Sequence, residues 1–249
     1  MRRMFVRGIW GDISANGIRD GKIWKDIQKI KENRYNENFV VIVFGEKNAQ
    51  VLKAEGFDTI LIDANPVRYD IEKLYRHKLD ILEYAFKFYD EIVYLDWDCT
   101  PTAHLPRDFW DKMHEKAPFQ ANLLQYRTKK CLWRNKDWRK VCNGGFLYIR
   151  EAQIATDFIN KYNELAELLA QKKKERESQG KELRFREKAL VFDDEPAFSK
   201  WIDDYSGGWP GEQKYWELFE PHFCNLRKKS AFSPELLKTK NECFVHWAK

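Results

Sequence analysis

Short apolar segments alternate with amphipathic ones over roughly the first hundred residues, and this alternation constrains the fold more than any other feature of the chain. Short continuous apolar runs are typical of buried strands, and apolar residues that recur every three or four positions are typical of helices. The expected strands are residues 4–9, 39–44, 59–62 and 91–95, and the expected helices are residues 22–33, 48–55 and 71–89. Strands that alternate with helices predict an α/β fold with a mostly parallel sheet and right-handed crossovers.

The second half of the chain has a less regular pattern. Its expected elements are strands at residues 121–126 and 145–149 and helices at residues 152–171 and 194–204. Residues 172–188 are rich in Lys, Arg and Glu, which predicts a solvated helix end and a surface loop. The alternative is a basic lid or a patch for acidic lipid headgroups. We find no internal repeat and no linker that would divide the chain.

Length and composition predict a globular chain. The 249 residues suit one large α/β domain, and 43% hydrophobic residues exclude a disordered chain. The net charge of +5 suits an anionic substrate but is no signature of nucleic-acid binding. The five cysteines form no C-x-x-C pair, and we identify no signal peptide or bilayer-spanning apolar run. We therefore expect free thiols, a cytoplasmic location and no transmembrane segment, with peripheral membrane contact left open.

Two aspartates, Asp96 and Asp98, directly follow the expected strand at residues 91–95. Side chains at positions i and i+2 point to the same side of an extended chain, so two hard oxygen ligands face one way at the carboxyl end of this strand. That edge is where ligands bind in open α/β sheets. Mg²⁺ or Mn²⁺ together with a phosphate-bearing substrate fits such a pair.

The Asp-x-Asp pair alone leaves three interpretations open. It can hold a metal for the pyrophosphate of a nucleotide sugar, it can cap the next turn, or it can belong to a haloacid-dehalogenase-like phosphatase. The phosphatase pattern D-x-D-x-T is present from Asp96 to Thr100, and Asp193 and Asp194 could form the late acidic pair of that family. That pattern normally opens its fold on the first strand, however, whereas here other strand–helix units precede it. The absence of G-x-G-x-x-G argues against NAD or FAD.

Four segments, in this order along the chain, resemble GT-A glycosyltransferases, especially the group of glycogenin and the bacterial lipopolysaccharide galactosyltransferases. They are residues 94–98 (YLDWD), 142–149 (CNGGFLYI), 192–198 (FDDEPAF) and 244–249 (FVHWAK). The resemblance implies a GT-A fold: a Rossmann-like, mostly parallel central sheet flanked by helices, with a smaller acceptor-side sheet. It implies a single domain over residues 1–249. Residues 1–100 would form the nucleotide-binding half, and residues 101–249 the acceptor-side half with a metal-binding C-terminal tail.

The resemblance implies a metal site made by Asp96, Asp98 and His246. An imidazole beside two carboxylates favours Mn²⁺ over Mg²⁺. Lys249 would contact the donor phosphate, although the family pattern usually has a glycine before this lysine and further residues after it.

The same resemblance implies contacts with the donor from other parts of the chain. Asn143 would touch the donor sugar and Gly144 would allow close backbone approach, although Asn-Gly also favours a β-turn. Lys78 would reach the donor phosphate or sugar, the alternative being a surface lysine. Asp12 and Asp63 would lie near the base and the ribose, where Asp63 could accept from the uracil ring; both could also be turn residues.

Asp194 and Glu195 are the expected catalytic residues. The family often has Asp-Gln at these positions, close to the acceptor and the anomeric carbon, whereas this chain has Glu in place of Gln. A carboxylate there could act as a base, as a nucleophile or as a stabilising anion. The structural alternative is capping of the helix that follows.

We therefore expect a metal-dependent hexosyltransferase that moves a sugar from a nucleotide-sugar donor, preferably UDP-linked, to a glycan, a lipid-linked acceptor or another hydroxyl. Mn²⁺ or Mg²⁺ is the expected cofactor, and nucleic acid is not an expected partner. The alternatives are a D-x-D-x-T phosphatase and a non-catalytic sugar- or nucleotide-binding relative. Trp97 is expected to pack inside the fold rather than touch substrate.

Overall fold

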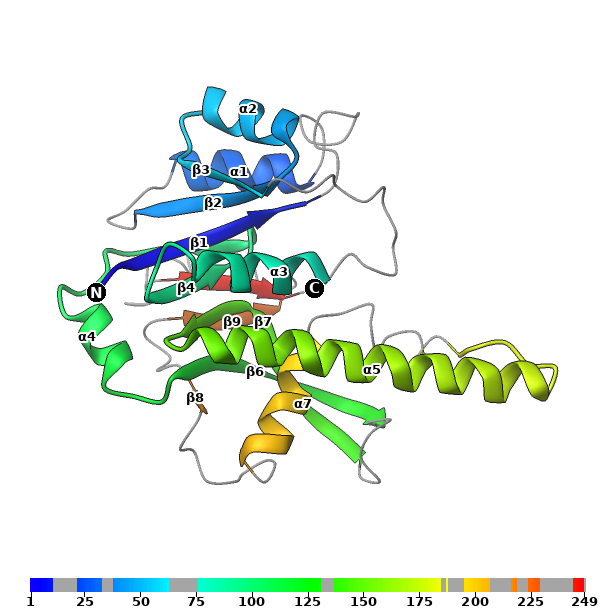
Figure 1. The fold of residues 1–249 in the computed structure, drawn as a ribbon. Coiled ribbons are helices and arrows are strands. Elements are labelled where there is room, and N and C mark those ends of the chain that lie inside the picture. The colour runs from blue at the N-terminus through cyan, green and yellow to red at the C-terminus, as the bar shows by residue number, and fades with distance from the viewer. Residues whose placement is uncertain are drawn as a thin grey trace.

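The computed structural model places two β-sheets, and helices cover both faces of the larger one (Figure 1). It describes residues 1–10, 22–32, 38–62, 76–130, 137–184, 187, 195–206, 216–218, 224–228 and 244–248.

The larger sheet has seven strands in the order β3-β2-β1-β4-β7-β6-β8. They are β1 (Arg3–Ile9), β2 (Phe39–Phe44), β3 (Thr59–Ile62), β4 (Glu91–Leu95), β6 (Phe119–Lys130), β7 (Asp137–Ile149) and β8 (Trp216–Leu218). Strands β1 to β4 are mutually parallel, whereas β7 runs antiparallel between β4 and β6. The predicted mostly parallel sheet is confirmed, and the carboxyl ends of its first four strands share one edge.

Helices pack on both faces of this sheet (Figure 1). They are α1 (Lys22–Glu32), α2 (Glu46–Ala54), α3 (Arg76–Ala85), α4 (Phe109–His114), α5 (Ala152–Ser178) and α7 (Glu195–Ser206). Val40 and Ile42 of β2 belong to one core cluster with residues of α3, α5 and α7, whereas Val41 and Val43 belong to a second cluster with residues of α1, α2 and α4. Because both faces are covered, β2 is apolar at every position, as its FVVIVF sequence predicts.

The smaller sheet has three strands in the order β5-β10-β9. They are β5 (Cys99–Pro101), β9 (Cys224–Lys228) and β10 (Phe244–Ala248). Strand β5 begins directly after the Asp96–Asp98 turn, and β10 pairs with it in the antiparallel direction. The smaller sheet therefore brings the C-terminal segment, red in Figure 1, next to the end of β4.

Several element boundaries differ from the expected ones. The expected strands at residues 121–126 and 145–149 are parts of the longer strands β6 and β7, and the expected helix at residues 152–171 continues to Ser178. The sequence did not predict α4, β5, β8, β9 or β10, which are three to six residues long. Segments this short contain too few residues to show a period.

The charged segment at residues 172–188 is a solvated helix end and loop over the part that the structure describes. Arg176 of α5 forms an ion pair of 2.8 Å with Glu187, which is buried. Residues 185, 186 and 188 lie outside the described part, as do residues 71–75 of the helix expected at 71–89.

Cysteines 99 and 142 are free thiols, and both are buried. Over the described ranges, the structure contains no helix with both the length and the apolarity needed to cross a bilayer.

Candidate functional site

Arg7, a fully buried residue of β1, holds the turn that follows β4. The Arg7 guanidinium donates hydrogen bonds to the carbonyl oxygens of Asp96, at 2.7 Å, and Cys99, at 3.2 Å. Trp97 is only 8% exposed and donates from Nε1 to the carbonyl oxygen of Gly8 at 2.9 Å, so the expectation that it packs inside the fold is confirmed. These contacts fix the backbone from which the Asp96 and Asp98 side chains project.

Two neighbouring side chains orient the Asp96 carboxylate. The Tyr94 hydroxyl donates to Oδ1 at 3.0 Å, and the Lys78 ammonium lies 3.0 Å from Oδ1 and 3.2 Å from Oδ2. The Lys78 side chain is 4% exposed and that of Asp96 is 28% exposed, so the carboxylate reaches the surface while the ammonium stays beneath it. Lys78 is therefore buried beside Asp96 and is not a surface lysine.

A β-bulge in β7 lies directly beside this carboxylate. The pairing with β6 shifts from Ala121–Leu147 to Asn122–Asn143, which leaves residues 144–146 without partners in β6. The carbonyl oxygen of Gly145 accepts the Asp96 amide at 2.8 Å, and the carbonyl oxygen of Gly144 accepts from Lys78 at 3.3 Å. The alternative interpretation of Asn143-Gly144 as a β-turn is wrong, because both residues lie within a strand whose extra residues turn its carbonyls toward the site.

Asn143 connects the bulge to the first turn of α7. Its Oδ1 accepts the amide of Gly145 at 3.1 Å, and its Nδ2 donates to Oε1 of Glu195 at 3.2 Å. One helical turn further along α7, the buried Ser199 hydroxyl accepts the backbone amide of Cys142 at 3.0 Å. These two contacts place the Glu195 carboxylate at the same edge of the sheet as Asp96.

An ion network between α7 and α5 holds these two helices together. Lys161 contacts Glu164 at 2.7 Å and Asp204 at 2.8 Å, while Lys200 contacts the same two carboxylates at 3.0 and 2.8 Å. Burial acts to raise the pKa of Asp204, but hydrogen bonds from Lys161 and Lys200 outweigh burial and leave this pKa below its usual value. The pKa of Glu164 is lowered in the same way, against the opposing effect of burial.

The C-terminal strand brings His246 to the same turn. In the register of β10 with β5, His246 lies opposite Cys99, the neighbour of Asp98, although it follows Asp96 by about 150 positions. The side chain of His246 is not among those that the structure describes, and the described side chains alone contain no cluster of three His, Cys, Asp or Glu residues suited to a metal. Two carboxylates at the surface and an imidazole from the adjacent strand are a donor set that fits Mn²⁺ or Mg²⁺.

The structure does not describe four further candidates: Asp12, Asp63, Asp194 and Lys249. Three other residues that contact the site were missed from the sequence: Arg7, Tyr94 and Ser199. An arginine inside the apolar segment of β1 is a signal that could have identified the first, since an unpaired buried charge is costly. Nothing in the local sequence distinguishes Tyr94 or Ser199 from ordinary core and helix residues.

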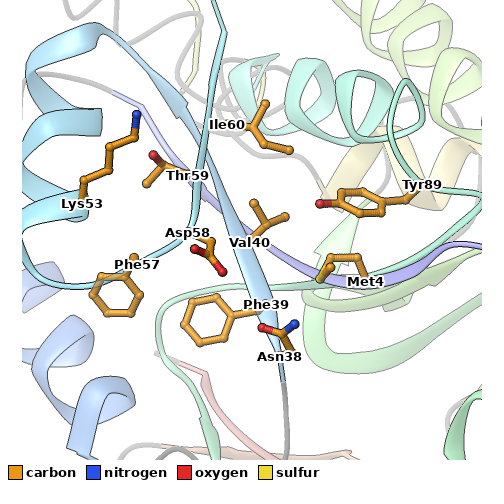
Figure 2. Close-up of a pocket in the computed structure, with 10 residues that line it drawn as sticks. All are labelled: Met4, Asn38, Phe39, Val40, Lys53, Phe57, Asp58, Thr59, Ile60 and Tyr89. Atoms are coloured by element: carbon orange, nitrogen blue, oxygen red, sulfur yellow. The ribbon is translucent and has the colours of Figure 1, made fainter.

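A cavity of about 560 Å³ lies away from these residues. Figure 2 shows its lining side chains, which include Met4, Phe39, Thr59 and Tyr89. The first three begin or lie near the beginning of β1, β2 and β3, and Tyr89 lies two positions before β4. This cavity is therefore at the amino ends of the strands, opposite the edge that carries Asp96.

Comparisons with known proteins identify similar folds but no close relative. No family model and no curated protein sequence matches the chain. Among solved structures, the galactosyltransferase LgtC, in complex with donor and acceptor sugar analogues, has a TM-score of 0.52 and 14% identity, over 98% of this chain and 87% of LgtC.

Two further solved structures have lower scores. GlyE of Streptococcus pneumoniae TIGR4 has a TM-score of 0.49 and 15% identity over all of this chain, which spans 55% of that protein. A glycosyltransferase involved in glycosylating the major capsid of PBCV-1 has a TM-score of 0.48 and 12% identity, over 99% of this chain and 92% of that one.

The likeness to LgtC confirms the resemblance to the lipopolysaccharide galactosyltransferase group at the level of the fold. The chain has the expected fold, with a mostly parallel central sheet, flanking helices and a smaller second sheet. The phosphatase alternative is not supported, because Asp96 follows the fourth strand of the chain rather than the first.

Proposed function

We propose that this chain is a metal-dependent glycosyltransferase that transfers a hexosyl group from a nucleotide sugar to a hydroxyl acceptor. The observation that carries the proposal is the convergence of four separate segments on the end of β4. Lys78 from α3 contacts Asp96, and Gly145 of β7 accepts the Asp96 amide. Asn143 of β7 bonds Glu195 of α7, and the strand that contains His246 pairs with β5 directly after Asp98. A pair of aspartates that only capped a turn would not need this arrangement.

Asp96, Asp98 and His246 would hold the divalent cation, Mn²⁺ in preference to Mg²⁺. When bound, such a cation supplies positive charge for the diphosphate leaving group. The Tyr94 hydroxyl holds the Asp96 carboxylate in one orientation, so this ligand loses little freedom on binding. We prefer a UDP-linked donor, with Asp12 and Asp63 toward the nucleoside and Lys249 toward the phosphate.

The β7 bulge and Lys78 form the donor side of the site. Glycines 144 and 145 carry no side chain that would prevent a sugar from approaching the backbone. Lys78 supplies a positive charge close to the proposed diphosphate position. Because Asn143 already bonds Glu195 and Gly145, its main action is to orient the carboxylate of α7.

Glu195 would serve the chemical step, with Asp194 beside it in the sequence. A carboxylate in this position takes the proton of the acceptor hydroxyl, or faces the positive charge that develops on the sugar ring. Asn143 fixes one oxygen of Glu195, and the ion network with Ser199 fixes the helix itself. The acceptor would be a glycan, a lipid-linked sugar or another hydroxyl, and the buried free thiols suit a cytoplasmic location.

A thermal-shift panel tests the donor site. The protein is incubated with UDP, GDP, CMP or phosphate, each with and without Mn²⁺, and with Asp98→Asn as the matched variant. We expect a rise in melting temperature with UDP only when Mn²⁺ is present, and none with Asp98→Asn, because one anionic ligand becomes neutral. Equal stabilisation of both proteins by Mn²⁺ and UDP would contradict the proposed metal site. Transfer from UDP-hexoses to water or simple glycosides then identifies the sugar.

A further inference from the structure

We propose that Lys78 is a resident counter-cation for Asp96 that the metal must displace, so that metal and nucleotide bind cooperatively. In the donor-free protein the Lys78 ammonium pairs with the Asp96 carboxylate. On donor binding it would move to the diphosphate. This inference rests on the proposed function, since it concerns regulation of the same site.

The contacts of Lys78 support this role. Its ammonium lies within hydrogen-bonding distance of both Asp96 oxygens and of the Gly144 carbonyl. It also lies 5.2 Å from the centre of the Tyr94 ring, within the range of a cation–π contact. Asp96 therefore already has a cationic partner before any ligand arrives.

Burial makes the pair necessary. An ammonium group out of contact with water is strongly destabilised unless an anion lies beside it. The Lys78 side chain is only 4% exposed, whereas the Asp96 side chain is 28% exposed. Lys78 consequently depends on Asp96 more than Asp96 depends on Lys78.

A divalent cation on Asp96 would change this balance. Two cations beside one carboxylate repel each other, and the repulsion weakens metal binding as long as the ammonium stays in place. A diphosphate would offer Lys78 a new anionic partner, and the lysine side chain has a flexible four-carbon stem that can reorient toward it. The nucleotide should thus raise metal affinity and, by linkage, the metal should raise nucleotide affinity by the same factor.

Metal binding to Lys78→Met tests the coupling without any measurement of activity. Binding of Mn²⁺ alone is followed by the loss of the spin-resonance signal of free Mn²⁺, and UDP binding is measured by calorimetry at saturating Mn²⁺. We expect Lys78→Met to bind Mn²⁺ alone about tenfold more tightly and Mn²⁺-dependent UDP about tenfold more weakly than the natural protein. Lys87→Met, which removes an exposed lysine beyond the other end of α3, should change neither. Unchanged or weaker binding of Mn²⁺ alone to Lys78→Met would overturn the proposal.

Unfolding in urea tests the ion pair independently of the proposed function. We expect Asp96→Asn to lower the denaturation midpoint more than Asp98→Asn, because it leaves a buried ammonium unpaired, and the added Lys78→Met substitution to restore part of the loss. Equal midpoints for the two aspartate variants, or no restoration, would overturn the role of Lys78 as counter-cation. If the natural protein binds neither Mn²⁺ nor UDP although the ion pair is measured, the proposed function and the coupling both fail while the pairing stands.

Discussion

Replacement of Ser199 by alanine should test whether the position of α7 controls the contribution of Glu195 to turnover. Ser199 and Cys142 are both fully buried, and the Ser199 hydroxyl is the acceptor for the Cys142 amide at 3.0 Å. Alanine removes this hydrogen bond in a place that water does not reach, which costs about 2 kcal/mol. For a chain of this size, that loss lowers the melting temperature by about 4–8 °C.

The same change should affect turnover more than donor binding. Glu195 lies one helical turn before Ser199, so a loosened helix misplaces the carboxylate, whereas Asp96 and Lys78 keep their own contacts. We expect kcat to fall about tenfold or more while the donor KM changes less than about twofold. Melting temperature and steady-state kinetics are measured on the same preparations.

Ser178→Ala is the matched control for Ser199→Ala. The Ser178 hydroxyl is exposed at the end of α5 and donates only to the carbonyl oxygen of Glu175. Its loss should change stability by less than about 0.5 kcal/mol. If Ser199→Ala is as stable and as active as Ser178→Ala, then this hydrogen bond does not hold α7 and does not position Glu195.

Three further predictions concern the chemical step, the C-terminal strand and acid stability. Glu195→Gln should lower kcat and leave donor affinity nearly intact, since a charge is lost and the hydrogen bond from Asn143 can remain; unchanged turnover would leave Glu195 a structural role only. Deletion of residues 244–249 should abolish Mn²⁺-dependent UDP binding with a modest loss of stability, and normal binding by the truncated protein would show that His246 is not a ligand. Below about pH 4.5, the usual glutamate value, stability should fall as Glu164 and Asp204, whose pKa values are lowered in the folded protein, take up protons. Urea unfolding between pH 6 and pH 3 should show a smaller fall in Lys161→Met, and equal falls would contradict the contribution of the network.

Local patterns in the sequence determined much of the first half of this protein. Strand β2 is apolar at every position, and β1, β3 and β4 are mostly apolar, because helices cover both faces of the sheet. That requirement can be read in the sequence. The aspartates were predictable for the same reason, since a polar pair directly after a buried strand must lie at the edge of the sheet. The resemblance of four short segments then indicated the fold, which the likeness to LgtC confirms.

Only the tertiary structure decided which side chains meet. Period and polarity indicate which face of an element is buried, but not which distant residue will contact it. The bond between Asn143 and Glu195 joins residues 52 positions apart, and the contact of Lys78 with Asp96 spans 18 positions. The β7 bulge was equally hidden, because Asn-Gly-Gly favours a turn when it is read alone and becomes part of a strand only when the residues around it pair with β4 and β6. Cooperative pairing of this kind outweighs local preference, since each strand gains its backbone hydrogen bonds from neighbours that the local sequence does not contain.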